Sequence, residues 1–355
     1  MGQHTRHTHI TSLFTAQHRW PCPGVLGFFQ EVERYLNLSG ILFSGEVPPQ
    51  LGNFSKLHYL DLSLSDNLYS TDLSWLAHLP TSLRITSLGI CQHLFTREPM
   101  LVSIFEHALR HLKSLWFLDL SDNHLIGHVP LEISTLTKLA WLDLSYNDLD
   151  GLITEELFDG LKSLKNIGLS DNRLKIVVGS DWIPPFRLKV ANLASCHIGP
   201  LFPSWFKWQM GISHINISRG NIIDRLPDWF SNSLSNVEVL DISGNQIIGA
   251  LPTNMETMSL SKLLLSSNNI TGQIPLLPRE LYYLDISRNF LSGPLPLNLG
   301  APRIEYLILR SNNFTGQIPV SFCEFDELYI LDLSNNNFEG ELPRCFKMEH
   351  LSFLL

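Results

Sequence analysis

The chain has 355 residues, of which 44% are hydrophobic and 17% are charged, and it carries a formal net charge of −9. This acidic balance argues against a nucleic-acid partner, because a nucleic-acid-binding face needs a clustered basic patch. No window reaches the roughly 18 consecutive apolar residues of a membrane-spanning helix, so no membrane span is expected within the chain.

Residues 1–35 contain no repeated pattern and form a separate N-terminal segment. Their opening stretch, MGQHTRHTHITSLFTAQHRW, is polar and lacks the apolar core of roughly 7–15 residues that a secretory signal requires. We predict that this segment is disordered and that a repeat array occupies residues 36–355.

From residue 36 onward one pattern recurs at intervals of about 24 residues. It reads LDLSDNHLIGHVP from Leu118, LDISRNFLSGPLP from Leu284 and LDLSNNNFEGELP from Leu331. Cys196 and Gly220 stand at the position that a marker asparagine holds in the other copies. These marker residues are Asn123, Asn147, Asn172, Asn245, Asn268, Asn289, Asn312 and Asn336. Self-similarity at a fixed period predicts a solenoid, in which each coil depends on its neighbours for a core.

The order of residues within one copy predicts the geometry of one coil. Alternating leucines point inward from a short strand, while the residues between them, such as Asp119 and Ser121, point outward. The marker asparagine can pair with backbone groups that the following turn would otherwise bury unsatisfied. Glycine allows the next corner, and proline stiffens the return segment. We therefore predict an α/β solenoid, a right-handed superhelix of about 12–13 coils with one short parallel β-strand per ~24-residue coil and a mostly irregular or 3-10 convex side.

Two places depart from this regularity. Residues 77–114 carry neither the marker asparagine nor the glycine–proline signal, and Leu101, Ile104, Phe105 and Leu109 recur there with helical spacing. We predict that this stretch is the least regular part of the array. The chain stops inside a further copy at Leu355, so we expect the array to be truncated at its C-terminus.

The repeated unit, LxxLxLxxNxLxGxIPxxLxxL, resembles the plant extracellular type of leucine-rich repeat. Its GxIP half is the specific part, and residues 272–275 and 316–319 match it fully. Within that family the chain is similar to the ectodomain of a plant receptor-like protein. The resemblance implies recognition of a protein or peptide ligand in defence or developmental signalling, together with a co-receptor kinase. It implies an extracellular or plasma-membrane location for the parent receptor, although this chain has no recognisable signal peptide.

A second interpretation stays open, because polygalacturonase inhibitors also use GxIP repeats. The chain would then be a soluble apoplastic inhibitor of a pathogen wall-degrading enzyme. Those inhibitors carry cysteine caps at both ends and about ten repeats, and this chain lacks the caps and has more repeats. The comparison favours the receptor class.

Cysteines and glycosylation motifs add two further expectations. Cys323 and Cys345 lie on the return segments of successive coils, so we predict a disulfide between them, with two buried free thiols as the alternative. Five Asn-x-Ser/Thr motifs are candidate glycosylation sites in a secreted parent, at Asn37, Asn53, Asn216, Asn269 and Asn313.

Catalytic motifs are absent from the sequence, which contains no G-x-S-x-G, H-E-x-x-H or C-x-x-C pattern. Aspartates recur once per coil, as at Asp119 and Asp285, but this spacing marks a fixed position of the repeat rather than a catalytic cluster. We predict that the chain is not an enzyme and uses no cofactor or metal.

The outward strand positions form the candidate binding surface, because they are free of core packing. Aromatic residues and arginine are the usual energetic anchors of protein interfaces. One group of them falls in consecutive C-terminal coils, and stacked strands would make it contiguous. Its members are Tyr282, Tyr283, Arg288, Tyr306, Arg310 and Tyr329. Trp116 and Trp141 are the candidates in the N-terminal coils.

Overall fold

The computed structural model describes residues 34–37, 39, 44–47, 49–63, 67–70, 74–87, 93–95, 106, 109–344 and 353–354. These residues belong to two units, the first comprising residues 1–152 and 156–164 and the second residues 153–155 and 165–355. The predicted N-terminal segment 1–35 lies outside the described residues except for Arg34 and Tyr35, and Tyr35 already begins the first strand.

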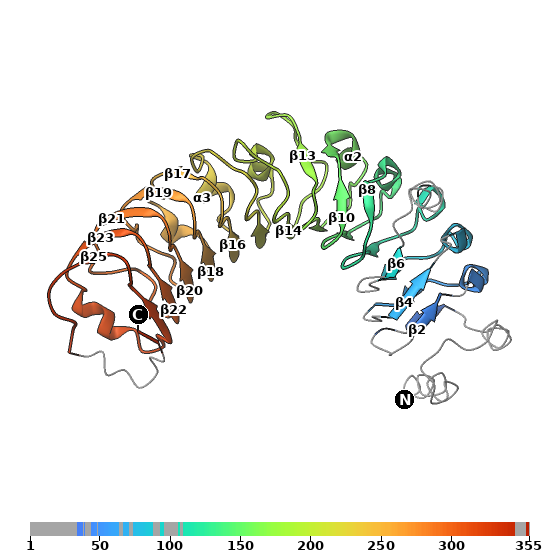
Figure 1. Cartoon of the computed structure of the whole chain (residues 1–355). Helices are drawn as coiled ribbons and strands as arrows, with labels where there is room; N and C mark the ends of the chain where they lie inside the picture. The colour runs from blue at the N-terminus through green and yellow to red at the C-terminus, as the bar shows by residue number, and fades with distance from the viewer. Residues whose placement is uncertain are drawn as a thin grey trace, which may run out of the picture. The chain divides into compact units, whose positions relative to one another are not determined.

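The first unit contains a row of short parallel strands (Figure 1, blue to green). In order along the row these are β1 (Tyr35–Asn37), β3 (Tyr59–Asp61), β5 (Ile85–Ser87), β7 (Phe117–Asp119) and β9 (Trp141–Asp143). Second strands pair separately, as β2 (Ser44–Glu46), β4 (Asn67–Ser70) and β6 (His93–Phe95), and as β8 (Ile126–His128) with β10 (Asp148–Asp150). The return segments carry the 3-10 helices η3 (Pro49–Asn53), η4 (Ser74–His78) and η5 (Leu131–Thr135).

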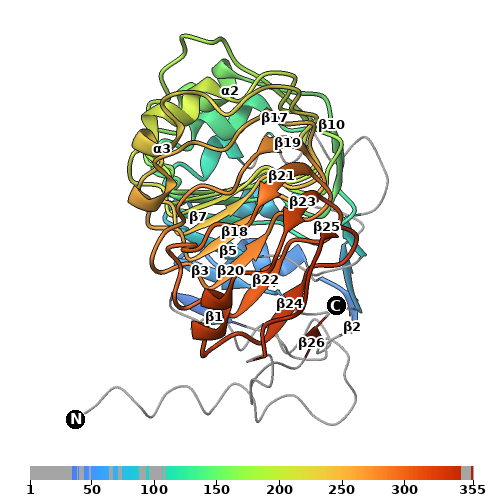
Figure 2. The same cartoon turned by 90° about the vertical axis from the view of Figure 1, so that its left-hand side faces the viewer.

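The second unit continues the same plan (Figure 1, green to red). Its main row is β12 (Asn166–Gly168), β14 (Val190–Asn192), β15 (His214–Asn216), β16 (Val239–Asp241), β18 (Lys262–Leu264), β20 (Tyr283–Asp285), β22 (Tyr306–Ile308), β24 (Ile330–Asp332) and β26 (Phe353–Leu354). Figure 2 shows β18, β20, β22 and β24 side by side.

A second row lies on the flank of the second unit, which Figure 2 shows beside the main row. It consists of β17 (Ile248–Gly249), β19 (Asn269–Gly272), β21 (Phe290–Pro294), β23 (Asn313–Gly316) and β25 (Asn337–Phe338). Two further short strands are β11 (Leu152–Thr154) and β13 (Lys175–Val177). The helices of the second unit are η6 (Ser204–Trp208), α3 (Phe230–Ser233), η7 (Met255–Thr257) and η8 (Val320–Glu324), whereas α2 (Glu155–Asp159) belongs to the first unit apart from Glu155.

The predicted leucine-rich-repeat solenoid is confirmed, and the flank strands are an addition to it. Among the described residues the main row has five strands in the first unit and nine in the second, against about 12–13 predicted coils.

The core lies between the strands and the return segments. The central leucines of the strands, such as Leu60, Leu118 and Leu284, are at most 2% exposed. One expectation about strand residues is wrong: the serine after the strand does not always face solvent. Ser145 and Ser287 are only 3% and 8% exposed, and the backbone amide of each donates to the aspartate two residues before it.

Within residues 77–114 the main row is regular at β5, and the irregularity of the stretch as a whole stays a prediction. β5 pairs in register with β3 on one side and β7 on the other, so that Leu60, Thr86 and Leu118 are neighbours. Thr86 is 3% exposed, and Leu79 and Leu83 fill the core positions of a coil. The row therefore continues through this stretch, although most of the segment 96–108 lies outside the described residues.

Candidate ligand-binding face

The second unit carries a row of aromatic side chains across its main strands. Tyr283 and Tyr306 open β20 and β22 and are register partners, and their rings stack with centroids 4.9 Å apart. Tyr329 meets Tyr306 edge-on at 5.8 Å. The Lys262 ammonium lies 4.7 Å from the centroid of the Tyr283 ring. These four residues form one continuous group, which we call the tyrosine row.

The stacking determines which parts of the tyrosine side chains a ligand can contact. The ring faces of Tyr283 are covered by Tyr306 and by Lys262, so ring edges and phenol hydroxyls remain for contact. Mutual packing of this kind fixes rotamers before a ligand arrives, which lowers the entropy cost of binding. Burial raises the pKa of Tyr283, with smaller contributions from Asp285, Tyr306 and Tyr282. Its hydroxyl therefore remains a hydrogen-bond donor at neutral pH.

Two shallow cavities adjoin the tyrosine row at the N-terminal ends of the strands. One, of about 390 Å³, is lined by Glu305, Tyr306, Asp326, Glu327 and Tyr329. The other, of about 300 Å³, is lined by Glu280, Tyr282, Arg303, Glu305 and Glu327.

Negative charge is concentrated in these two cavities. Glu280 is paired with Arg303 at 2.7 Å, whereas Glu305, Asp326 and Glu327 have no salt-bridge partner among the described residues. Unpaired carboxylates beside tyrosine rings form a suitable environment for a cationic group.

The two predicted arginines lie at the other end of the strands. Arg288 and Arg310 are both exposed in the turns that follow β20 and β22, and the Arg288 amide donates to the Arg310 carbonyl at 2.8 Å. Their charges therefore stand apart from the acidic cavities by the length of a strand. The sequence correctly grouped Tyr283, Tyr306 and Tyr329, while Tyr282 belongs to the adjoining cavity rather than to the tyrosine row.

A second aromatic group lies in the first unit. Phe117 and Trp141 are register partners whose rings stack at 5.3 Å, and the Trp116 ring lies 6.5 Å from that of Phe117. Tyr35 and Tyr59 stack at 4.0 Å at the start of the same strand row.

The residues that sequence reasoning missed share repeat positions with those it named. Lys262, Tyr35 and Tyr59 occupy the first position of a main-row strand, as Tyr283 does. Glu305 directly precedes such a strand. Reading the same position in every coil would have found them.

The candidate glycosylation asparagines lie at three kinds of position. Asn37 and Asn216 end main-row strands, Asn53 ends η3, and Asn269 and Asn313 begin flank strands. The Asn216 side-chain oxygen accepts from the Ser218 amide at 3.1 Å and from its hydroxyl at 2.8 Å. Their modification stays a prediction.

Cys323 is disulfide-bonded. Cys345 lies outside the described residues, so the predicted pairing of the two is untested. Within the described ranges, no group of three or more His, Cys, Asp or Glu side chains is arranged to hold a metal ion. No helix found in the described part of the chain is long and apolar enough to cross a membrane.

Comparison with known proteins agrees with the fold. The family model described as Leucine Rich Repeat matches residues 114–136, 236–258, 259–281, 303–325 and 327–348. Receptor-like protein EIX2 of Solanum lycopersicum is 39% identical over 132 residues, which cover 37% of this chain and 13% of that protein. The chain thus spans well under two thirds of this relative.

Solved ectodomains extend the similarity to most of the chain. The Arabidopsis receptor kinase HAESA, solved with the peptide hormone IDA and the co-receptor SERK1, superposes with a TM-score of 0.71 at 26% identity, over 90% of this chain and 57% of that one. The PEPR1–AtPEP1 structure gives a TM-score of 0.66 at 27% identity, over 90% and 51%. The chain accordingly carries leucine-rich repeats and is similar to plant receptor-like proteins and to the ectodomains of plant receptor kinases, of whose length it spans a part.

Proposed function

We propose that the main-row face of the second unit is a ligand-recognition surface of a plant cell-surface receptor, and that its ligand is a protein or peptide. The observation that carries the proposal is the tyrosine row itself. Four side chains from consecutive coils are packed against one another on a face where none is needed for the core. Preorganised aromatic groups of this kind are typical of interface anchors.

The charges around the tyrosine row suggest the chemistry of the ligand. Glu305 and Glu327 line both cavities, so a lysine or arginine side chain of the ligand would find carboxylates and tyrosine edges together. Arg288 and Arg310 would meet an acidic group of the same ligand at the far ends of the strands. An extended peptide lying across the strands, basic toward one edge and acidic toward the other, fits this distribution of charge.

The relatives support this class of ligand. HAESA was solved with a peptide hormone and a co-receptor, and PEPR1 was solved with AtPEP1. We infer by analogy that the parent of this chain acts at the plasma membrane in defence or developmental signalling, and that it recruits a co-receptor kinase.

A displayed random peptide library, selected against the whole chain, tests the proposal. Selected peptides should lose about thirtyfold or more in affinity when Tyr306 is replaced in Tyr306→Ala, which corresponds to about 2 kcal/mol at an interface anchor. The matched control is Tyr146→Ala, because Tyr146 is 55% exposed and lies in the first unit.

A second pair of variants tests the charge complementarity. Glu305→Gln and Glu327→Gln should weaken peptides that carry Lys or Arg and should reduce the salt dependence of their binding. If peptides bind equally to the parent chain, Tyr306→Ala and both glutamine variants, the tyrosine row is not the site. Binding of a fungal wall-degrading enzyme, with no peptide selected, would instead favour the inhibitor interpretation.

A further inference from the structure

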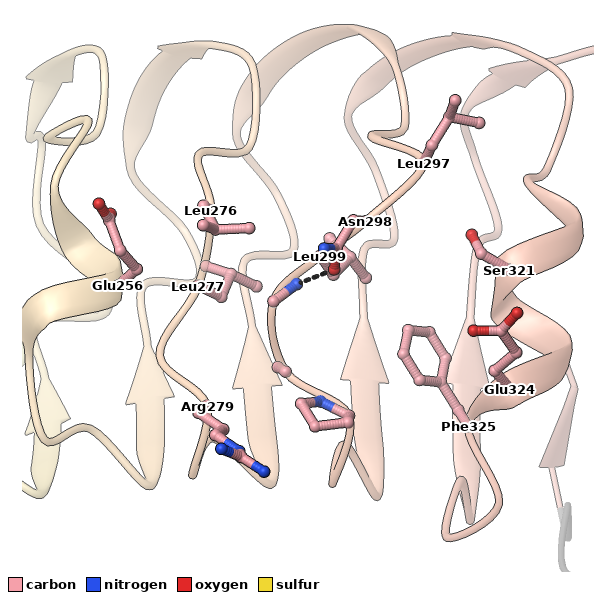
Figure 3. Close-up of a pocket in the computed structure, with 13 residues that line it drawn as sticks. Glu256, Leu276, Leu277, Arg279, Leu297, Asn298, Leu299, Ser321, Glu324 and Phe325 are labelled. Carbon is pink, nitrogen blue, oxygen red and sulfur yellow. Dashed lines mark hydrogen bonds between the residues drawn. The ribbon is translucent and has the colours of Figure 1, made fainter.

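The return side of the second unit contains a groove between two 3-10 helices. η7 (Met255–Thr257) forms one wall and η8 (Val320–Glu324) the other, while the two coils between them return through residues 276–279 and 297–302 without any helix (Figure 3). The cavity has a volume of about 780 Å³.

The sequence of the two intervening coils explains the missing helices. They read IPLLPRE from Ile274 and PLPLNLGAPR from Pro294, and proline cannot donate the backbone hydrogen bonds of a helix. Gly300 has a φ of +82°, and a Cβ atom there would meet the Leu277 carbonyl oxygen at 2.6 Å. The backbones of the two coils therefore lie in close contact at the floor of the groove.

Apolar side chains line this groove and also project from its edge. Leu277, Leu299 and Phe325 are buried in the floor and one wall, whereas Leu276 is 44% exposed and Leu297 is 80% exposed (Figure 3). A group of exposed aliphatic side chains around a hollow differs from scattered surface leucines and marks an interaction site.

Three polar side chains of the groove, Glu256, Ser321 and Glu324, bear on its chemistry. Glu256 lies on one wall and Glu324 on the other, and neither carboxylate has a salt-bridge partner within the described residues. The Ser321 hydroxyl is buried and makes no hydrogen bond. Arg279 lies near one end of the groove (Figure 3). The charged side chains on the two walls are Glu256 and Glu324, so the walls are negatively charged.

The two coils without a helix leave a place for one. η7 and η8 belong to coils three apart, and the two coils between them return without a helix (Figure 3). One short helix would take the place of the two that these coils lack.

We propose that this groove docks an amphipathic helix of a partner protein, with an apolar face and basic flanking residues. Its apolar side chains would cover Leu276 and Leu297, and its lysine or arginine residues would meet Glu256 and Glu324. This surface lies on the opposite side of the coils from the tyrosine row, so both can be occupied at once.

A model helix tests the proposal with the whole chain. The probe is a fluorescent Leu/Lys peptide of about five turns with apolar residues at i, i+3, i+4 and i+7, compared with a Leu/Glu peptide of the same pattern and with a proline-interrupted Leu/Lys peptide. Binding is followed by anisotropy. The Leu/Lys helix should bind saturably, and the other two peptides at least tenfold more weakly.

Variants of the chain then assign the binding to this groove. Leu297→Asp should weaken the Leu/Lys helix at least tenfold, whereas Leu201→Asp, at a leucine that is 66% exposed elsewhere in the second unit, should leave it unchanged. The Glu256→Lys, Glu324→Lys double variant should prefer the Leu/Glu helix. Equal binding by parent and Leu297→Asp would overturn the proposal. So would a concentration-dependent dimer, seen by sedimentation and lost in Leu297→Asp, because the occupant would then be a second copy.

Discussion

At the scale of residues, the marker asparagine in the turn after a main-row strand is a bridge between coils. The Asn289 amide nitrogen donates to the carbonyls of Leu265, Ile286 and Ser287 at 3.0–3.1 Å, and its oxygen accepts from the Ile270 amide at 3.0 Å. The side chain is 6% exposed, so water cannot replace these bonds. Asn268 and Asn312 repeat the arrangement in the neighbouring coils.

Replacing this asparagine should be costly. Asn289→Ala leaves buried carbonyls and an amide without partners, so we expect a loss of about 1–3 kcal/mol in the free energy of unfolding. The control is Asn337→Ala, because Asn337 is exposed in β25 and should cost under about 0.5 kcal/mol. Denaturant midpoints measure both. Equal losses would contradict the bridging role of Asn289.

Cys196 shows how the same position tolerates a different residue. Its thiol donates to the Leu169 carbonyl at 3.2 Å and is fully buried. Burial raises its pKa to about 12, so the native thiol stays protonated and unreactive. Iodoacetamide at pH 8, with labelling mapped to Cys196 by mass spectrometry, should modify it in urea and spare it in the native protein. Native labelling at a rate close to that in urea would show that the site is open.

The same pKa predicts a dependence of stability on pH. The unfolded thiol titrates near its ordinary value of 9.0, below the native value, so the native state retains the proton longer. The stabilising contribution is present below pH 9 and is lost as the pH rises toward 12. Cys196→Ala should show a smaller loss of stability over that interval than the parent chain.

At the scale of elements, the strand row persists where the consensus fades. β5 retains the register of its neighbours although residues 77–114 lack the asparagine and the GxIP signal, because buried leucines such as Leu79 and Leu83 suffice to align the coil. The flank strands could not be predicted from alternation, since each is only a few residues long. Four of the five in the second unit also end at a glycine or proline, residues that the repeat pattern had assigned to a turn.

Hydrogen exchange checks the continuity of the row. The Arg84 amide donates to the His58 carbonyl at 2.9 Å, and the Trp116 amide donates to the Arg84 carbonyl at 2.7 Å. Peptides covering residues 83–87 should therefore be protected to a degree similar to residues 116–120. Exchange of residues 83–87 at the rate of an unfolded peptide would show that the strand row is interrupted there.

At the scale of the whole molecule, the repeat period was sufficient to predict the architecture but not the surface. Each coil contributes one short strand at a regular interval, so the solenoid follows from the spacing. The contacts within the tyrosine row depend on the register between coils. Tyr306 is the register partner of Ile330, and Tyr329, one residue earlier, also contacts the Tyr306 ring. The groove beside Leu297 exists because two coils lack a helix. The prolines in those coils were the one sequence feature that indicated this.

Hydroxyl-radical footprinting with a peptide selected on the chain tests the central claim most directly. Oxidation of Tyr283, Tyr306 and Tyr329 should fall when the peptide binds, while Tyr146 and Leu297, both exposed elsewhere, should be unchanged. If the three tyrosines are oxidised equally with and without saturating peptide, the ligand binds elsewhere and the tyrosine row is not the recognition surface.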